Sequence, residues 1–230
     1  MARKRKEQAV NSLPAKLSTH LRSVGLPFPA QHRILVVLQR RLECSVFEFI
    51  RTTHPQLSQM KEWDCAERVE LNTAFRALER KFRDHVTLDP QSRHTNDGLS
   101  RLRADIMGVR HAAVHRQPQD HCRLLRQLRS AHEFATVWLG DQQCGREIQQ
   151  CQGRLDLLFE EWERRSRRVT ENLTERMEYY NDLYRGPMRN RHQYLLREAA
   201  RRLSNKINHD CIEQVDVMLQ ASFSPLYAKP

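Results

Sequence analysis

The chain has 230 residues and a formal net charge of +11, with 39 Lys and Arg against 28 Asp and Glu. This length allows one large domain, or one domain with an extension, and the charge favours acidic partners such as nucleic acid or an anionic membrane surface. No apolar run approaches the roughly 20 residues that span a bilayer. A C-x-x-C pair and a secretory signal are also absent, which disfavours a zinc ribbon and a secreted protein.

The first half of the chain predicts helices only, because glycine is rare and no long stretch alternates apolar and polar residues. Residues 1–30 are expected to be a basic, partly disordered lead-in punctuated by proline. A first helix is predicted over about 31–52, since His54-Pro55 ends its apolar periodicity. A second is predicted from 57–58 to about 86, and a polar loop follows over 89–98.

The second half continues the helical pattern. A third helix is predicted over 99–116 and ends before Pro118. A fourth begins at Asp120 and closes at Gly140. Asp141 is the expected N-cap of a long helix that runs to about residue 185, where Gly186-Pro187 stops it. A last helix is predicted to run to about Leu219.

The predicted architecture is all-α. Short connections between consecutive helices imply antiparallel neighbours. We therefore expect an up-down bundle of four or five helices over residues 31–140, a long helical hairpin over 141–221 and a loose tail over 222–230. The long helix starts with coiled-coil heptads that fade and resume out of phase, which favours an extended helix that bends or changes its packing partner.

The segment from Arg110 to His115, at the end of the third predicted helix, is the strongest candidate for chemistry. Arginine is a fixed cation that can fork onto a phosphate. Histidine is the side chain best suited to move a proton near neutral pH. The segment therefore predicts chemistry on a phosphodiester. The alternative interpretation is a solvated basic helix end beside the turn at Pro118.

An unbroken helix would not aim Arg110 and His115 at one point, because five steps of about 100° place them roughly 140° apart. They could still meet if the helix ends near Val114 and the chain re-aims His115, or if two copies pair as a homodimer and share a cleft. His111 and His115 have the spacing of paired metal ligands, but no Glu follows His111. We therefore predict no metal and no cofactor.

An arginine followed by a polar residue, three further residues and a histidine near a helix end resembles the signature of the HEPN superfamily (higher eukaryotes and prokaryotes nucleotide-binding). Its active members are all-α, metal-independent endoribonucleases, and the residue after the arginine is typically Asn, Asp or His. The resemblance covers about residues 31–140. It implies that Arg110 holds the scissile phosphate, that His115 is general base or acid, and that His111 orients the site.

A second resemblance rests on two longer strings, VRHAAVHR at 109–116 and FATVWLGD at 134–141. They are similar to an "R-H-x-A-V-H-R" box and an "F-A…L-G-D" box in a family of fungal proteins of unknown role. Some members carry the name ubiquinol–cytochrome-c reductase cytochrome c1, which would imply a respiratory-chain component. The chemistry of this chain contradicts that name, because there is no C-x-x-C-H motif for haem attachment.

Other cations are candidates for nucleic-acid binding. One is Arg116, which adjoins His115, and the others form a cluster on the long helix at Arg164, Arg165, Arg167 and Arg168. The alternative for the cluster is a solvated helix face. The basic run Arg3–Lys6 is typical of a nuclear localisation signal. We therefore expect an intracellular protein, cytoplasmic or nuclear rather than mitochondrial.

Two functions follow from these patterns. The first is a helical domain that binds RNA or another polyanion, with endoribonuclease activity at Arg110 and His115. The second is a non-enzymatic protein interaction module, in which the long charged hairpin recruits partners. The two differ in whether Arg110 and His115 share a cleft in the folded chain.

Overall fold

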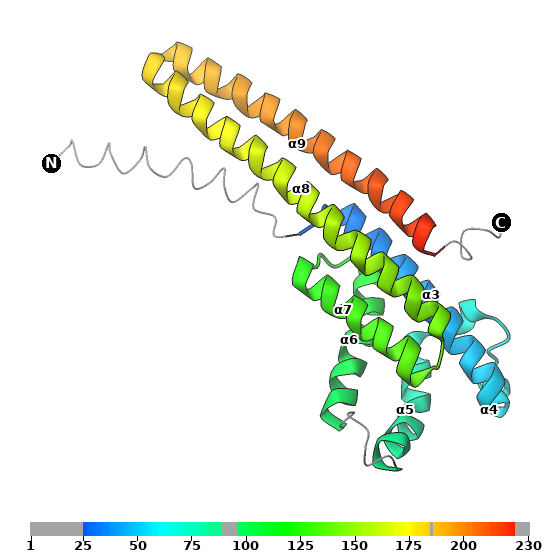
Figure 1. Ribbon diagram of the computed structural model, residues 1–230. Helices are drawn as coiled ribbons and strands as arrows, with labels where there is room; N and C mark the ends of the chain where they lie inside the picture. Colours follow the sequence, from blue (N-terminus) through cyan, green and yellow to red (C-terminus); the bar gives the residue numbers. More distant parts are fainter. Residues whose placement is uncertain (1–24, 89–95, 185, 224–230) are drawn as a thin grey trace. The chain divides into compact units, whose positions relative to one another are not determined.

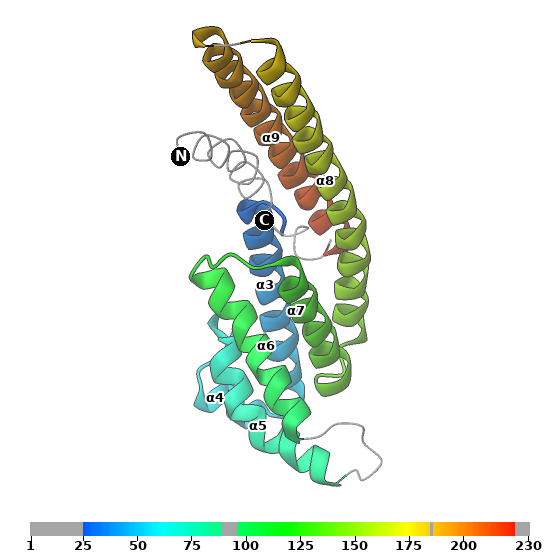
Figure 2. The same cartoon turned by 90° about the vertical axis from the view of Figure 1, so that its left-hand side faces the viewer.

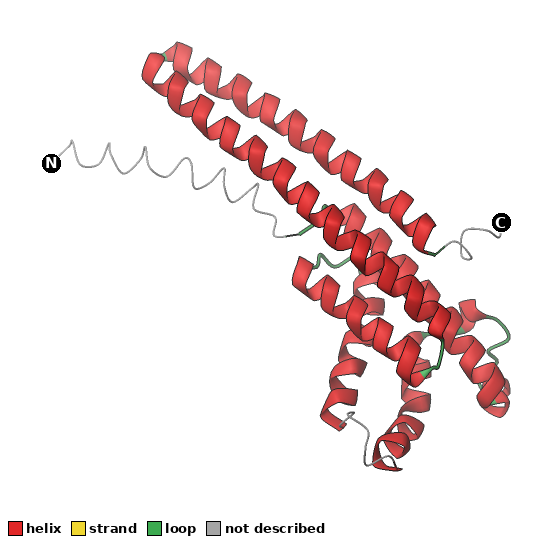
Figure 3. Cartoon of the chain, in the orientation of Figure 1, coloured by secondary structure: helices red, strands yellow, loops and turns green. Residues whose placement is uncertain are grey.

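The computed structural model describes residues 25–88, 96–184 and 186–223, and every regular element in these ranges is helical (Figure 3). The all-α prediction is confirmed. In chain order (Figure 1) the elements are α3 (Phe28–Thr53), α4 (Pro55–Met60), the 3₁₀ turn η1 (Ala66–Arg68), α5 (Leu71–Leu88), α6 (Asn96–Val114), α7 (His121–Glu133), the π-helical turn η2 (Phe134–Trp138), α8 (Gln142–Leu183) and α9 (Pro187–Ser222). None of these helices has an apolar stretch long enough to cross a membrane.

Contacts divide the described chain into two compact units. The bundle unit contains residues 28–156 and 215–223, and the hairpin unit contains 25–27 and 157–214. The expected long C-terminal helical pair is present as α8 and α9. The start of α8 and the end of α9 belong to the bundle unit, whereas the rest of both helices forms the hairpin unit. The long helix α8 therefore changes its packing partner along its length.

The core of the bundle unit lies among α3, α5, α6 and α7 (Figure 2). Four aromatic side chains from α5 and η2 meet there, with ring centroids 5.2 to 6.1 Å apart: Phe75, Phe82, Phe134 and Trp138. Each fully buried large apolar side chain contributes about 1.5–3 kcal/mol. The π-helical turn matters because it directs both ends of η2 inward, with Phe134 1% and Trp138 6% exposed.

The prediction of one helix from 57–58 to 86 is wrong. The chain forms the short helix α4, a turn, η1, and only then α5. The break places Trp63 in the core at 7% exposure. Its amide donates to the Ser58 carbonyl at 3.0 Å, and the Ser58 hydroxyl donates back to the Trp63 carbonyl at 2.6 Å. Tertiary burial of one large side chain has overridden local helix propensity.

The end signals after residue 118 act as predicted. The Asp120 side chain accepts a hydrogen bond from the Arg123 amide at 2.7 Å, and Asp141 accepts one from the Cys144 amide at 2.9 Å. Gly140 between the two helices has a φ of +69°, a conformation that side chains disfavour. These caps satisfy amides that a helix start leaves unpaired.

In the hairpin unit α8 and α9 run side by side (Figure 1, Figure 2). Trp162 donates to the Asn208 side chain at 3.1 Å, and Arg165 bonds Asp210 at 2.6 Å. Beside the connecting turn, Tyr184 and His192 stack with ring centroids 4.4 Å apart. The hairpin is therefore held by a few polar and aromatic contacts in addition to its apolar seam.

Candidate functional site

The end of α6 is a tight, fully hydrogen-bonded helix stop. The His115 amide still donates to the His111 carbonyl at 2.9 Å, and the Gln117 amide reaches back to the Ala112 carbonyl at 3.1 Å. Arg116 between them has a φ of +51°. The bond from Gln117 to Ala112 is the longer of the two bonds of a Schellman motif, and Arg116 has the left-handed conformation that glycine usually adopts there. The helix ends near Val114 as one of our hypotheses required, but His115 keeps its helical bond.

Helix α3 fixes this turn from the other side. His32 donates to the Ala113 carbonyl at 3.0 Å, and the buried Gln31 side chain accepts a bond from the Gln119 amide at 2.7 Å. These two bonds satisfy backbone groups that the end of α6 and the following turn leave open. The candidate segment is therefore held rigidly against the bundle.

Arg110 points to carboxylates and not to the histidines. Its guanidinium donates to Glu70 at 2.9 Å, and the arginine side chain is 23% exposed. Glu43 of α3 also lies in its electrostatic range. Glu70 directly precedes α5, where the positive end of the helix dipole favours acidic side chains. Arg110 thus links α6 to the start of α5.

Glu43 shows how these charges balance. Burial raises the pKa of the Glu43 carboxyl, while a hydrogen bond from Gln39 at 2.8 Å and the charge of Arg110 act in the opposite direction. The burial effect is the larger one. A half-buried carboxyl and the carboxylate of Glu70 therefore both compete with any external anion for Arg110.

His111 and His115 are brought together on the exposed side of α6. Their ring centroids are 4.5 Å apart, and both side chains, like that of Arg116, are exposed. Arg110 has its hydrogen bond on Glu70 instead. The helical divergence that the sequence predicts between Arg110 and His115 is consequently what the chain adopts.

This arrangement suits phosphate chemistry poorly. The phosphate-binding arginine is held by a carboxylate, and the histidines lie at a helix C-terminus, where the partial negative charge of the last carbonyls repels anions. The three buried thiols are poorly suited to nucleophilic chemistry as well, because burial raises the pKa of Cys144, Cys151 and Cys211 to about 12 in each case. No cluster of three or more potential metal ligands occurs within the described ranges.

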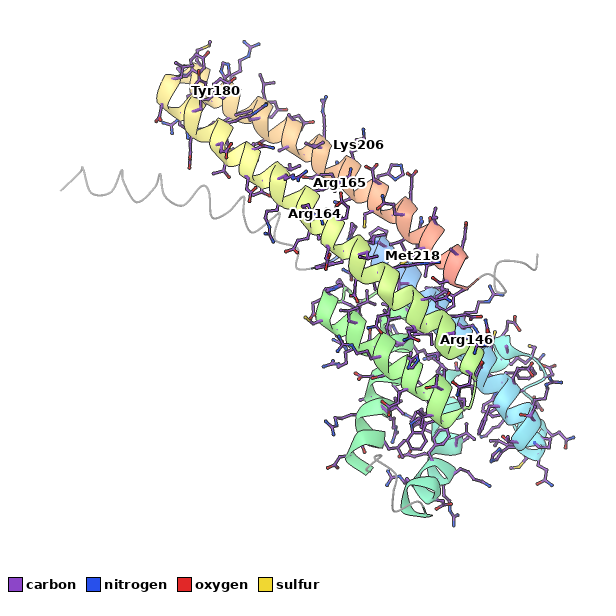
Figure 4. All side chains as sticks on the ribbon, in the orientation of Figure 1. Arg146, Arg164, Arg165, Tyr180, Lys206 and Met218 are labelled. Atoms are coloured by element: carbon purple, nitrogen blue, oxygen red, sulfur yellow. The ribbon has the colours of Figure 1, made fainter. Side chains whose placement is uncertain are left out.

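The arginine cluster of α8 is largely neutralised. Arg164 pairs with Glu161, Arg167 bonds Glu163 at 3.0 Å, and Arg165 bonds Asp210 across the hairpin. Figure 4 shows Arg164 and Arg165 midway along α8. Only Arg168 of the four has neither an ion pair nor a hydrogen bond within the described residues. An arginine that already pairs with a carboxylate contributes less free energy to binding a phosphate.

The first half of α9 holds the unpaired cations that sequence reasoning missed. Residues 187–206 contain six Lys and Arg but one acidic residue, Glu198. Arg191 and Arg197 are exposed and make no ion pair within the described ranges. Tyr194 between them is 67% exposed. A net-charge count over this helix would have been the signal that finds them.

The fold and these surfaces define an all-helical protein with a helical bundle and a pair of long helices. No known protein family, curated protein or solved structure matches this chain. The resemblances to the HEPN superfamily and to the fungal family therefore stay predictions.

Proposed function

We propose that this protein is a non-catalytic helical binding protein that holds single-stranded nucleic acid on α9. The carrying observation is the cationic ridge, which we define as Arg191, Tyr194 and Arg197. These residues follow one another at intervals of three, so they are neighbours on the helix surface. An exposed aromatic ring between two arginines without acidic partners offers a stacking surface for a base and two contacts for phosphates.

The cationic ridge supports this role better than the arginines of α8 do. Binding to a nucleic acid gains free energy when bound counterions are released by a protein cation. Arg164 and Arg167 already have carboxylate partners on their own helix. Arg191 and Arg197 carry no such compensation, so a phosphate would be their first strong partner.

Catalysis by Arg110 and His115 is not part of the proposal. Arg110 would have to leave Glu70 and then bind a phosphate beside two carboxylates, which the charges oppose. The test is incubation of the purified chain with structured and single-stranded RNA, beside the variants Arg110→Ala and His115→Ala. We expect no cleavage in any sample. Cleavage by the wild type that both variants lose would restore the endoribonuclease hypothesis.

Binding itself is tested by the anisotropy of a labelled single-stranded RNA at several salt concentrations. The variant R191Q/R197Q is compared with R164Q/R167Q, which loses the same net charge. We expect the ridge variant to reduce the slope of log K against log salt by about 0.7 for each lost phosphate contact, and the α8 variant to leave it unchanged. Equal losses in both variants would show that only net charge matters.

The stacking role of Tyr194 is tested separately. Base stacking on an aromatic side chain is worth about 1–3 kcal/mol, so Tyr194→Leu should weaken RNA binding by at least about fivefold. Tyr179 is a matched control on α8, because it is 62% exposed and lies outside the ridge. Tyr179→Leu should leave the affinity unchanged. A Tyr194→Leu variant that binds RNA like the wild type would exclude stacking there.

A further inference from the structure

A second surface of α9 is apolar and uncovered within the described residues. Leu195 is 53% and Leu203 48% exposed, and the small residue Ala199 lies between them. Intervals of four place all three on one side of the helix. We call them the outer stripe. They line a groove whose other walls are Glu198, Arg202 and Lys206. Contiguous apolar residues rimmed by charged ones are typical of an interaction surface.

The outer stripe is symmetric about its centre. A leucine stands four residues before Ala199 and another stands four residues after it. In an antiparallel pair of α9 helices with a twofold axis at Ala199, Leu195 of each copy would lie opposite Leu203 of the other. Ala199 would meet its own counterpart, and its small side chain lets two helix backbones approach closely. The pattern of side-chain sizes is thus self-complementary.

The charges beside the stripe are self-complementary as well. Glu198 and Arg202 lie on the same flank of α9, and a twofold interface brings the same flanks of both copies together. In the register given by Ala199, Glu198 lies about 3 Å along the axis from both Arg202 and Glu198 of the second copy, so the two arginines offset the repulsion between the two carboxylates. Two symmetric ion pairs would therefore frame the leucines, as charged flanking positions do in paired helices.

We propose that the outer stripe binds a second copy of this chain, so that α9 forms an antiparallel homodimer contact centred on Ala199. A nucleic acid fits the stripe less well, because Leu195, Ala199 and Leu203 carry neither a charge for a phosphate nor an aromatic ring for a base. Within one chain Glu198 already bonds Arg202 at 3.1 Å and Arg201 at 3.0 Å. The same carboxylate can extend this network to the second copy without leaving a buried charge alone.

Sedimentation velocity of the full chain over a wide concentration range tests the contact. We expect a reversible monomer–dimer equilibrium for the wild type. Leu195→Glu should weaken dimerisation by at least about tenfold, because each dimer would bury two new carboxylates. Leu157→Glu is the matched control, since Leu157 is 69% exposed on α8 and lies outside the outer stripe. Circular dichroism of each variant checks that its helix content is unchanged.

A charge exchange tests the register. Glu198→Arg and Arg202→Glu should each weaken the dimer, because each creates like-charge contacts twice in a symmetric interface. The double variant E198R/R202E restores opposite charges between copies and should recover dimerisation. If the copies meet elsewhere, neither single variant will change dimerisation, and the proposed contact is then wrong. A double variant that dimerises as weakly as the single variants would overturn the register.

Other occupants of the stripe would give different results. A wild-type chain that stays monomeric at every concentration overturns the proposal. So does a chain that dimerises only when RNA is added, or one whose binding to phosphatidylserine vesicles is lost in Leu195→Glu. The variant Arg197→Gln changes a ridge residue on the far side of α9 from Ala199 and should dimerise normally, so failure of this contact is separable from failure of RNA binding by the cationic ridge.

Discussion

The end of α6 and the first half of α9 both present arginines beside aromatic or histidine rings, but they differ in what the arginines bind. At the end of α6 the cation is already paired within the chain, because Arg110 bonds Glu70 and lies near Glu43. On α9 the exposed Arg191 and Arg197 have no acidic partner in the described part of the chain. The sequence shows where a cation lies. Its neighbours in the folded chain determine whether it stabilises the fold or is available to bind an anion.

The same contrast separates two arginine–glutamate pairs. Arg41 of α3 bonds Glu147 of α8 at 2.6 Å inside the bundle unit, and the Glu147 side chain is only 4% exposed. Arg167 and Glu163 form a pair at 3.0 Å on the surface of α8, with exposures of 65% and 51%. A buried charge must be compensated by its partner, whereas an exposed one is compensated by water.

The largest effect is expected from Glu147→Ala. Removal of this carboxylate leaves the guanidinium of Arg41, whose side chain is 13% exposed, with only the longer contact to Asp141 at 3.4 Å. We predict a loss of about 3 kcal/mol in the free energy of unfolding, because removal of one partner of a largely buried ion pair typically costs that much. Urea denaturation followed by circular dichroism measures it.

Glu163→Ala is the matched control for Glu147→Ala. Its loss of a surface pair should change the free energy of unfolding by at most about 0.5 kcal/mol. Equal effects of both substitutions would break the comparison, since burial would then not decide the importance of an ion pair.

Helix boundaries were the most predictable part of the fold, because their signals are local. Asp120, Gly140 and Asp141 act at their own positions through caps and a left-handed turn. The break around Trp63 was not predictable in this way. The 7% exposure of that ring is a property of the folded chain, whereas the local sequence pattern predicts an uninterrupted helix.

The same distinction between local and long-range effects applies to the candidate site. Helical geometry alone predicts that Arg110 and His115 diverge, since the angle depends only on their separation. It cannot identify Glu70 as the partner of Arg110, because the two residues are 40 positions apart in sequence. The unpaired cations of α9 were present in the composition of residues 187–206, but their lack of partners is a property of the folded chain.

A smaller effect concerns Glu43 and pH. Burial raises the pKa of Glu43 in the folded state, so its stabilising contribution is complete below the unfolded value of about 4.3 and is lost as pH rises through the folded value. Glu43→Gln stays neutral and keeps an oxygen that can accept bonds. We therefore predict that it is more stable than the wild type near pH 7, by less than about 1 kcal/mol.

Urea denaturation at several pH values checks the Glu43 prediction. The advantage of Glu43→Gln should disappear at acid pH, where the wild-type carboxyl is also protonated. Arg110→Ala should raise the pKa of Glu43 further, because the arginine charge lowers it. The chemical shift of the Glu43 carboxyl carbon, followed as a function of pH, gives this pKa in the wild type and in Arg110→Ala. A pKa that does not respond to Arg110→Ala would remove the electrostatic link between α3 and α6.

Two substitutions at Arg116 separate its structural role from binding. Its φ of +51° is strained for a residue with a side chain but not for glycine. Arg116→Gly should therefore raise the free energy of unfolding by about 0.5 kcal/mol, the helix-end gain being partly offset by the greater freedom of glycine in the unfolded chain. Arg116→Val, with a branched side chain, should lower it by about 1 kcal/mol. Because RNA is assigned to the cationic ridge, neither variant should change RNA affinity, and a loss in Arg116→Gly would return the end of α6 to the binding surface.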